Sequence, residues 1–565
     1  MFRVIVCTLF LFIMLSTETM TQSPFLSATV TAFNPSNTNI SILNTQKSKS
    51  INNINSLFNE LKQKSGISIQ YLVHSLYNLS ESTSTGITWS QEHSTTPREL
   101  IDASHFYGQR GLASIGLTFI DLYNFDHNYT YLVTANQIAN YLFVMSKNSN
   151  SGIFWVKSKE DSTNWIGTRY GNAGIIPFYL KLYQTTNNET YLSIANQAAN
   201  FLINIAQNNG TNKEYWLANG EKGYIITDYY YGVSGIIDCL LQIYDVTHNS
   251  TYLTYAIAGG NFLNSLILKE NVNSNTGYIP WTISPVANYD QLVFTGYLNG
   301  QAGIGQTFLY LYDHTNTLLW LESAITLGNW LITQDKNDSG LYNSAGSSYL
   351  THLSDVSGNI IGFGSGSLGI ANFYLNIYQH QPSNIWLYKI IRIMNLIEKV
   401  TTKVSKGSII PYQYQENSEN EYLMGRFSGL SGVVGILAQF NYYFNNSEYW
   451  NQLDTFVTTL SIYINQYNGF LPFEIGTDII NVNGEDGIAS MINSLLLIEN
   501  LSSLTLGSLS QQYNQALLSI PPPQITYPPS QKEGSTGNLS IYFGDIISSL
   551  ILIGIIISVK KHKTK

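Results

Sequence analysis

Four acidic residues of this 565-residue chain stand where they could carry out acid–base chemistry. Asp228, Glu474, Glu485 and Asp486 lie just before, within or close to short glycine-containing segments that also carry aromatic residues. Two carboxyl groups can cleave a glycosidic bond, because one protonates the leaving oxygen while the other acts as base or nucleophile. We take these four as candidate catalytic residues of a glycoside hydrolase or lyase. Each of them could instead cap a helix or stabilise its amino end.

A second set of residues could bind a ligand beside these carboxylates. Aromatic rings pack against the apolar faces of sugars, and arginines clamp anionic groups. The same residues have structural alternatives, because tyrosines often pack, a histidine often bonds to its neighbours, and an arginine often pairs with a carboxylate. The candidate ligand-binding residues are Asp102, His105, Arg169, Tyr170, Trp216, Tyr230, Trp281 and Arg426.

Other kinds of chemistry find no motif in the chain. It has no G-x-S-x-G, no phosphate-binding P-loop, no H-E-x-x-H and no C-x-x-C, so serine hydrolases, nucleotide enzymes and zinc proteases are not indicated. The net charge of −9 and the lack of basic patches argue against nucleic acid as a partner. Cys239 is the one cysteine outside the first 22 residues, and a lone buried thiol is the expected reading.

A repeated glycine motif indicates how these residues are positioned. Seven copies of Gly-x-x-Gly followed by an aliphatic residue occur, at intervals of 55 to 68 residues. The motifs begin at Gly108, Gly171, Gly232, Gly300, Gly366, Gly429 and Gly484. Because glycine costs about 1 kcal/mol in a helix, its repetition predicts close backbone approach.

Each copy predicts one buried inner helix, one amphipathic outer helix and a connecting loop. The segment GIIPFYLKLYQTT is apolar on nearly all sides, whereas TYLSIANQAANFLINIAQN has one apolar stripe. A unit of this kind needs stacked neighbours to cover its apolar face. Seven copies predict an all-α, closed α/α toroid with seven inner and seven outer helices. We expect the helix near Ile51–Lys64 to close the circle.

The two ends of the chain predict a membrane-anchored protein at the cell surface. Residues 1–22 resemble a signal peptide, 23–50 a flexible segment, and 51–519 the toroid. A proline-rich stalk at 520–540 precedes an apolar stretch at 541–559, which is long enough to span a bilayer. The basic tail 560–565 should lie in the cytoplasm, which leaves the large domain outside. An uncleaved amino-terminal anchor is the alternative to a signal peptide.

Four N-x-[ST] sequons fall at the predicted turns between inner and outer helices. These are at Asn128, Asn188, Asn249 and Asn445. Sequons in exposed turns of an extracytoplasmic protein predict N-glycosylation, although a chain so rich in Asn, Ser and Thr also produces sequons by chance.

The sevenfold motif resembles that of the lanthionine synthetase C-like proteins, which are α/α toroids, whereas six-hairpin glycosidases have six such units. Active members of that family bind zinc through a Trp-Cys-x-Gly and a Cys-His-Gly motif. The corresponding positions here carry Gly364, Phe427 and Ser428. These residues cannot form a Cys/His zinc site, so the resemblance implies no cofactor and no zinc-dependent cyclase chemistry.

The sequence leaves two functions open. The first is a membrane-anchored toroid that binds a peptide or glycan at its centre without zinc chemistry. The second is a carbohydrate-active enzyme that uses paired carboxylates. Carboxylates that are each held by other groups would favour binding, whereas a close pair over an aromatic floor would favour hydrolysis.

Overall fold

The structure is a computed structural model that describes residues 37–94, 100–102, 104–220, 223–269, 271, 274–283, 292–335, 338–342, 359–405, 407–414, 421–501 and 507–519. The predicted signal peptide, the predicted stalk, the apolar stretch at 541–559 and the basic tail lie outside these residues. Within the described ranges, no helix combines the length and apolar character that a bilayer crossing requires.

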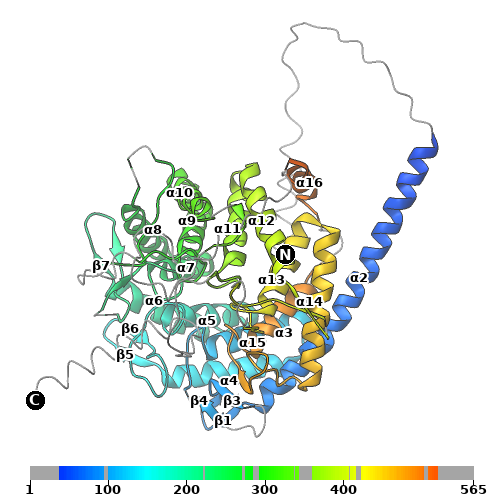
Figure 1. Cartoon of the computed structure of the whole chain (residues 1–565). Coiled ribbons are helices and arrows are strands. Elements are labelled where there is room, and N and C mark those ends of the chain that lie inside the picture. Colours follow the sequence, from blue (N-terminus) through cyan, green and yellow to red (C-terminus); the bar gives the residue numbers. More distant parts are fainter. Residues whose placement is uncertain are drawn as a thin grey trace, which may run out of the picture.

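In the described residues, seven pairs of helices make up the body of the molecule, which Figure 1 shows in outline. The inner helices each begin directly after a glycine of the repeated motif. They are α3 (Leu112–Asp126), α5 (Asn172–Thr186), α7 (Val233–Thr247), α9 (Gln301–Thr315), α11 (Ser367–His380), α13 (Leu430–Phe444) and α15 (Ile488–Glu499). The outer helices are α2 (Asn37–Asn78), α4 (Tyr129–Met145), α6 (Glu189–Ile205), α8 (Ser250–Ser265), α10 (Leu318–Gln334), α12 (Asn384–Val400) and α14 (Ser447–Gln466).

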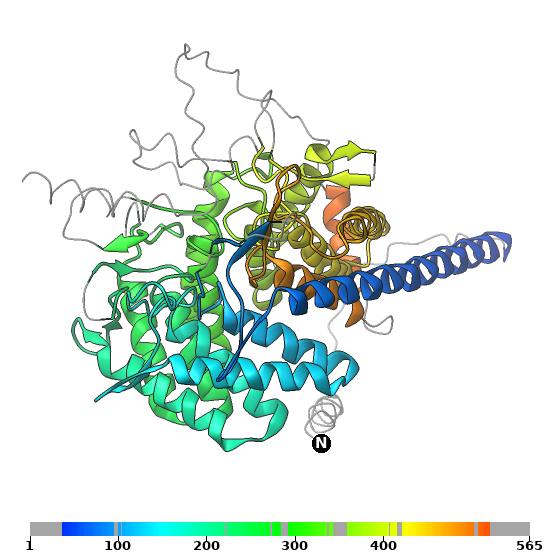
Figure 2. The ribbon, with the colours of Figure 1, turned by 90° about the horizontal axis from the view of Figure 1, so that it is seen from below.

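The inner helices form a closed ring. Each one packs against the next along the chain, and α15 returns to pack against α3. The long helix α2 packs against α15 and α14, so the first helix of the described residues completes the outer layer, as the sequence predicted. Its amino-terminal part projects beyond the ring (Figures 1 and 2). The start of α2 at Asn37 corrects one expectation, because residues 37–50 are helical rather than part of a flexible segment.

Short strands form the loops that connect outer helices to the next inner helices. Most are two-stranded antiparallel hairpins, while β13 pairs with β3 and thereby joins the last loop to the first. The strands are β1 (Glu81–Thr83), β2 (Gly86–Thr88), β3 (Glu92–Ser94), β4 (Leu100–Asp102), β5 (Lys147–Ser149), β6 (Gly152–Phe154), β7 (Gln207–Asn208), β8 (Glu214–Tyr215), β9 (Ile225–Ile226), β10 (Thr282–Ile283), β11 (Thr402–Val404), β12 (Gly407–Ile409) and β13 (Ile479–Asn481). A last helix, α16 (Ser510–Ser519), packs against α12 and α13.

The motif glycines permit close approach to backbone carbonyls. A Cβ atom added at Gly303 would lie 1.8 Å from the carbonyl oxygen of Tyr297, and one at Gly174 would lie 1.9 Å from that of Thr168. Both distances are far below van der Waals contact, so no larger residue fits without moving the loop. The packing role predicted from the repeated glycines is therefore confirmed at these positions.

The register of the motif differs in the first and last copies. In the middle five copies the first glycine of the pair precedes the helix, whereas in copies one and seven the second glycine, Gly111 or Gly487, does so. Ser114 and Ser490 then occupy the position of the second helical glycine. Gly484 faces Ser114 and donates its N–H to the serine Oγ at 2.9 Å. Where the last copy meets the first, the glycine therefore lies in the loop of copy seven and the serine lies on the helix of copy one.

The inner helices are not apolar on all sides. Residues six and ten positions after the capping glycine share one helical face, and several of them are polar and half-buried. On α3 and α5 these positions include Asp121 and Lys181, which form an ion pair between the two helices. On α7, Asp238 accepts hydrogen bonds from Tyr229 and Gln242. The prediction of inner helices buried all round is therefore wrong along this polar stripe.

Two aspartate–histidine pairs link inner helices near their carboxyl ends. His314 Nε2 lies 2.9 Å from Asp245, and His380 Nε2 lies 2.7 Å from Asp313. The Nδ1 atom of His380 lies 2.7 Å from the carbonyl oxygen of Asn376. Both ring nitrogens of His380 thus face acceptors, which suits the imidazolium form. The hydrogen bond to Asp313 raises the pKa of His380 despite the opposing effect of burial.

This pair should make the ring more stable in mild acid. Because the folded-state pKa of His380 is raised, its contribution is complete below the unfolded pKa and is lost as the pH rises through the folded value. The free energy of unfolding of the wild type should exceed that of His380→Gln near pH 5.5 by a margin that shrinks near pH 9. Partial exposure limits this margin to below about 1 kcal/mol. Parallel denaturation curves at the two pH values measure it, and a margin that grows with pH would contradict it.

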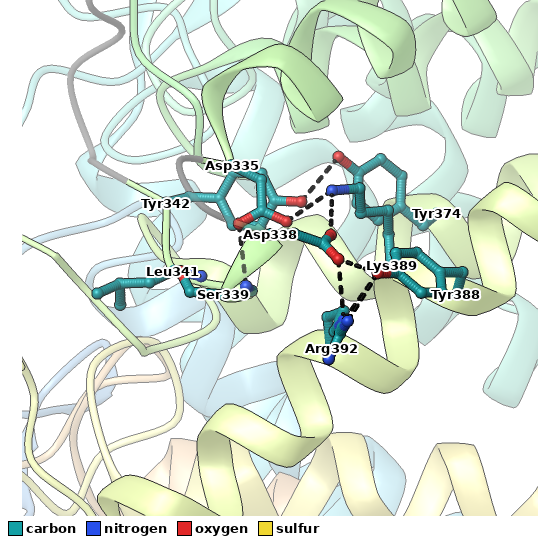
Figure 3. Close-up of polar contacts among 10 residues, drawn as sticks. Asp335, Asp338, Ser339, Leu341, Tyr342, Tyr374, Tyr388, Lys389 and Arg392 are labelled. Carbon is teal, nitrogen blue, oxygen red and sulfur yellow. Dashed lines mark hydrogen bonds and ion pairs between the residues drawn. The ribbon is translucent and has the colours of Figure 1, made fainter. Parts of the chain in front are cut away.

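A cluster of four charges fastens the end of α10 to α12 (Figure 3). Lys389 Nζ lies 2.7 Å from Asp335 and 2.8 Å from Asp338, and Arg392 Nε lies 3.0 Å from Asp338. The Tyr388 hydroxyl also donates to Asp338. Two cations neutralise two carboxylates, so the cluster is a structural clamp whose acidic groups are already occupied.

Candidate ligand-binding site at the amino-terminal end of the barrel

The loops that precede the inner helices are joined by a belt of backbone hydrogen bonds. One residue of each copy takes part, and the N–H groups of the first six copies each donate to a carbonyl oxygen of the next copy. The bonds run from Arg110 to Arg169 (3.0 Å), Arg169 to Tyr230 (2.9 Å), Tyr230 to Leu298 (3.0 Å), Leu298 to Gly364 (2.7 Å), Gly364 to Phe427 (2.8 Å) and Phe427 to Glu485 (3.1 Å). The belt fixes side chains from all seven copies around the amino-terminal end of the barrel.

Aromatic rings dominate this end. A second hydrophobic cluster, separate from the main core, contains Tyr170, Tyr230 and Trp281 among its buried members. Half-buried rings border it, and neighbouring copies contribute rings in contact, with centroids 5.0 Å apart for Tyr297 and Phe363 and 6.2 Å apart for Phe363 and Phe427. The ring faces that remain partly exposed are the kind of surface that packs against sugars or apolar side chains.

Arg169 lies in the wall of this end rather than at its surface. Its side chain is 1 % exposed and lies 3.2 Å from Glu485, whose side chain is 4 % exposed. It donates a hydrogen bond to the Tyr231 hydroxyl, and its guanidinium lies 4.7 Å from the ring centre of Tyr230 and 5.2 Å from that of Tyr170. The structure therefore supports the pairing alternative for Arg169 and Glu485, and neither is placed to clamp a ligand.

Arg110 and Arg426 differ from Arg169 because both are only half-buried. Arg110 lies 5.3 Å from the ring centre of Phe106, and its Nε atom has no hydrogen-bond partner. Within the described part of the chain, neither guanidinium forms an ion pair. Burial lowers the pKa of Arg426, while Tyr297 and Asp121 oppose that effect. These two cations are available to an anionic ligand.

Three of the four candidate catalytic carboxylates, Asp228, Glu485 and Asp486, are held by other groups. Asp228 is fully buried and accepts hydrogen bonds from the Tyr231 N–H (2.7 Å), Trp281 Nε1 (2.7 Å) and Asn299 Nδ2 (2.9 Å). Burial raises the pKa of Asp228 to about 6, although these hydrogen bonds oppose the rise. The role of Asp228 is to brace its own loop and the next one.

Asp486 and Glu474 do not form a close pair of carboxylates of the kind that catalysis would need. Asp486 accepts from the backbone N–H and the hydroxyl of Ser428, at 2.8 and 2.9 Å. Glu474 is half-buried and belongs to an isolated bridge with Leu423. Its pKa is raised by burial and then by the charge of Glu421. The belt brings Glu485 and the loop of Asp486 to the amino-terminal end, while no contact joins Glu474 to Asp228.

Two of the remaining candidate residues, Trp216 and His105, have structural positions. The structure corrects the prediction that Trp216 binds a ligand, because Trp216 is 1 % exposed in the main core and its Nε1 donates to the Leu202 carbonyl at 2.7 Å. Buried His105 lies between Glu160 (2.8 Å from Nδ1) and Glu81 (3.2 Å from Nε2), which makes it a structural histidine. Asp102 lies in β4, and its side chain falls outside the described atoms.

The sequence reasoning missed the two phenylalanines as site residues. Phe427 entered it only as the replacement of a zinc-motif residue, and Phe363, the residue before Gly364, was not considered as a site residue. Phe363 and Tyr297 share the third position before the capping glycine with Tyr229, and the three supply adjacent rings. An aromatic residue at this position in three successive copies was the available signal.

The zinc of the lanthionine synthetase family does not fit this end of the barrel. Gly364 and Phe427 are hydrogen-bonded neighbours, so the motif positions do converge, but they bring no thiolate or imidazole. Ser428 is engaged with Asp486. Among the residues that the structure describes, no group of three His, Cys, Asp or Glu could hold a metal ion.

The fold defines an α/α toroid, and the loops at the amino-terminal end of its barrel form a site lined by aromatic rings and arginines. Residues 108–352 match the family described as lanthionine synthetase C-like protein, so this stretch of the chain is similar to that family. No curated protein sequence matches the chain.

Solved structures with a similar arrangement include a nisin cyclase, with 17 % identity, 81 % of this chain and 97 % of that chain covered, and a TM-score of 0.46. A cellobiose 2-epimerase from Bacillus thermoamylovorans has 12 % identity, covers 65 % and 93 % of the two chains, and has a TM-score of 0.47. An α-1,6-mannanase from Salegentibacter has 14 % identity, covers 69 % and 98 %, and has a TM-score of 0.40.

Proposed function

We propose that this protein is a membrane-anchored, extracytoplasmic toroid that binds an anionic glycan or peptide at the amino-terminal end of its barrel and performs no zinc-dependent cyclase chemistry. The placement outside the cell rests on the signal-like start, the apolar stretch at 541–559 and the basic tail.

The observation that carries the binding role is the pair of uncommitted arginines beside partly exposed rings. Arg110 and Arg426 come from different copies at the same end of the barrel, since Arg110 belongs to the belt and Arg426 directly precedes the belt residue Phe427. Tyr229, Phe363 and Phe427 offer ring faces there. A guanidinium binds carboxylate or sulfate strongly when partly desolvated, and rings supply area for sugar or side-chain packing.

The enzyme alternative receives weaker support. The raised pKa of Asp228 would suit a general acid, but its side chain is fully buried and both of its oxygens accept hydrogen bonds. Proton transfer requires the acid to reach the leaving oxygen. Turnover of a glycan that is abolished by Asp228→Asn, with binding retained, would favour this alternative.

The test measures binding of the purified full chain to arrays of neutral, uronate-containing and sulfated glycans and of peptides. Arg426→Gln and Arg110→Gln should each weaken binding by roughly tenfold or more, since hydrogen bonds to charged groups contribute about 1.5–3 kcal/mol. Lys147→Gln, on exposed strand β5, removes the same charge elsewhere and should change nothing. Binding of neutral ligands alone, or equal binding by all variants, would refute the proposal.

A further inference from the structure

We infer that Asn128, Asn188 and Asn249 carry N-linked glycans while they continue to cap their outer helices. The inference rests on the extracytoplasmic placement proposed above. It singles out three sequons from the larger number in the sequence, because these three share a local geometry.

Each of the three asparagines is the residue directly before an outer helix. The side-chain Oδ1 accepts a hydrogen bond from the backbone N–H of the sequon threonine, at 3.1 Å for Asn128 and at 3.0 Å for both Asn188 and Asn249. The preceding residues His127, Asn187 and His248 are in the left-handed region, with φ of 59°, 55° and 54°. The same turn is therefore built three times in successive copies.

This geometry leaves the modifiable Nδ2 atom out of the capping bond, although the Asn128 side chain also forms a hydrogen bond with Tyr131. All three asparagines are exposed, and Oδ1 alone makes the capping bond, so Nδ2 is directed away from the helix end. N-glycosylation forms a bond between Nδ2 and the anomeric carbon of a lipid-pyrophosphate-linked oligosaccharide. The bond from that carbon to the pyrophosphate oxygen breaks, and one amide proton is released. The amide oxygen remains an acceptor, so a glycan does not remove the cap.

The fourth predicted sequon has a different geometry. Asn445 has a φ of 47° and ends α13, while its neighbour Asn446 caps α14. The Oδ1 atom of Asn445 accepts from Trp450 Nε1 at 2.9 Å. A Cβ atom at Gly507 would lie 3.0 Å from the Asn445 Cβ, so the segment before α16 lies close to this side chain. We expect lower glycan occupancy at Asn445.

Peptide mapping by mass spectrometry of the full chain, purified from the cells that naturally produce it, tests the inference. Glycans should be present on Asn128, Asn188 and Asn249, with lower occupancy on Asn445. Absence of glycans from the three capping asparagines, or full occupancy of Asn445, would overturn it. Ligand binding is measured separately, so either proposal can fail alone.

Three variants at one site separate the glycan from the cap. Asn188→Asp and Thr190→Ala each remove the sequon but keep a capping oxygen, whereas Asn188→Gln removes both. All three should lose the glycan mass at this site. Only Asn188→Gln should also lose the cap, lowering Tm by about 1–2 °C relative to the other two. Equal Tm values for all three would show that the asparagine does not cap the helix.

Discussion

Gly303→Ala is expected to destabilise the ring by about 3 kcal/mol or more, because the new Cβ would lie 1.8 Å from the Tyr297 carbonyl oxygen. The obstructing atom belongs to the backbone of the loop that carries Tyr297, so relief of the clash requires movement of the belt itself. Thermal and denaturant unfolding followed by circular dichroism would measure the loss.

Gly435→Ala provides the matched control within another inner helix. Its added Cβ would meet nothing closer than 3.4 Å, the Cδ1 atom of Leu497. Alanine favours a helix over glycine by about 1 kcal/mol, so this variant should be as stable as the wild type or more stable. Similar stabilities for the two variants would contradict the close-approach role of the motif glycine.

Glu485→Gln is expected to cost about 3–5 kcal/mol, since it removes the carboxylate that faces a buried guanidinium. The substitution preserves the shape of the side chain, so the loss of stability measures the cost of leaving the buried Arg169 charge without its partner, and not the cost of a cavity. Both partners lie at the belt, and the change should therefore lower the melting temperature of the whole ring. Thermal unfolding at several salt concentrations measures the loss, which should change little with salt because the pair is buried.

Glu60→Gln serves as the control for this second prediction. Glu60 pairs with Lys64 at 2.8 Å on α2, but its side chain is 57 % exposed. Exposed pairs contribute about 0–1 kcal/mol, so the control should unfold close to the wild type. If Glu485→Gln proved as harmless as this control, the buried pair would have no part in stabilising the barrel end.

The architecture was predictable because it depends on residues that repeat. Glycine lacks a side chain, and its recurrence at one point of every copy indicated a shared packing constraint. The apolar periodicity of Ile51–Lys64 also identified the closing helix, which α2 confirms. The shifted register in copies one and seven was not predictable, since it depends on tertiary structure: Gly111 rather than Gly108 precedes α3, and Ser114 then contacts Gly484 across the joint.

The site was less predictable because its residues depend on tertiary partners. Asp228 is a bracing residue only through Trp281 and Asn299, which lie 53 and 71 positions away in the sequence. Trp216 could have been recognised as structural. Trp89 and Trp155 donate their ring N–H to a carbonyl 13 residues earlier, and Trp216 donates to one 14 residues earlier.

The claim that α2 closes the ring of helices is tested most directly by a disulfide between α2 and α14. The hydroxyl oxygens of Ser68 and Ser461 lie 2.8 Å apart although the residues are 393 positions apart in the chain. The Ser68→Cys/Ser461→Cys variant should form a disulfide under mild oxidation, seen as a mobility change on non-reducing gels that reductant reverses. A pair made from Ser68→Cys and Ser193→Cys, on α6, should not form one. Two thiols that stay free at positions 68 and 461 would contradict the closed ring.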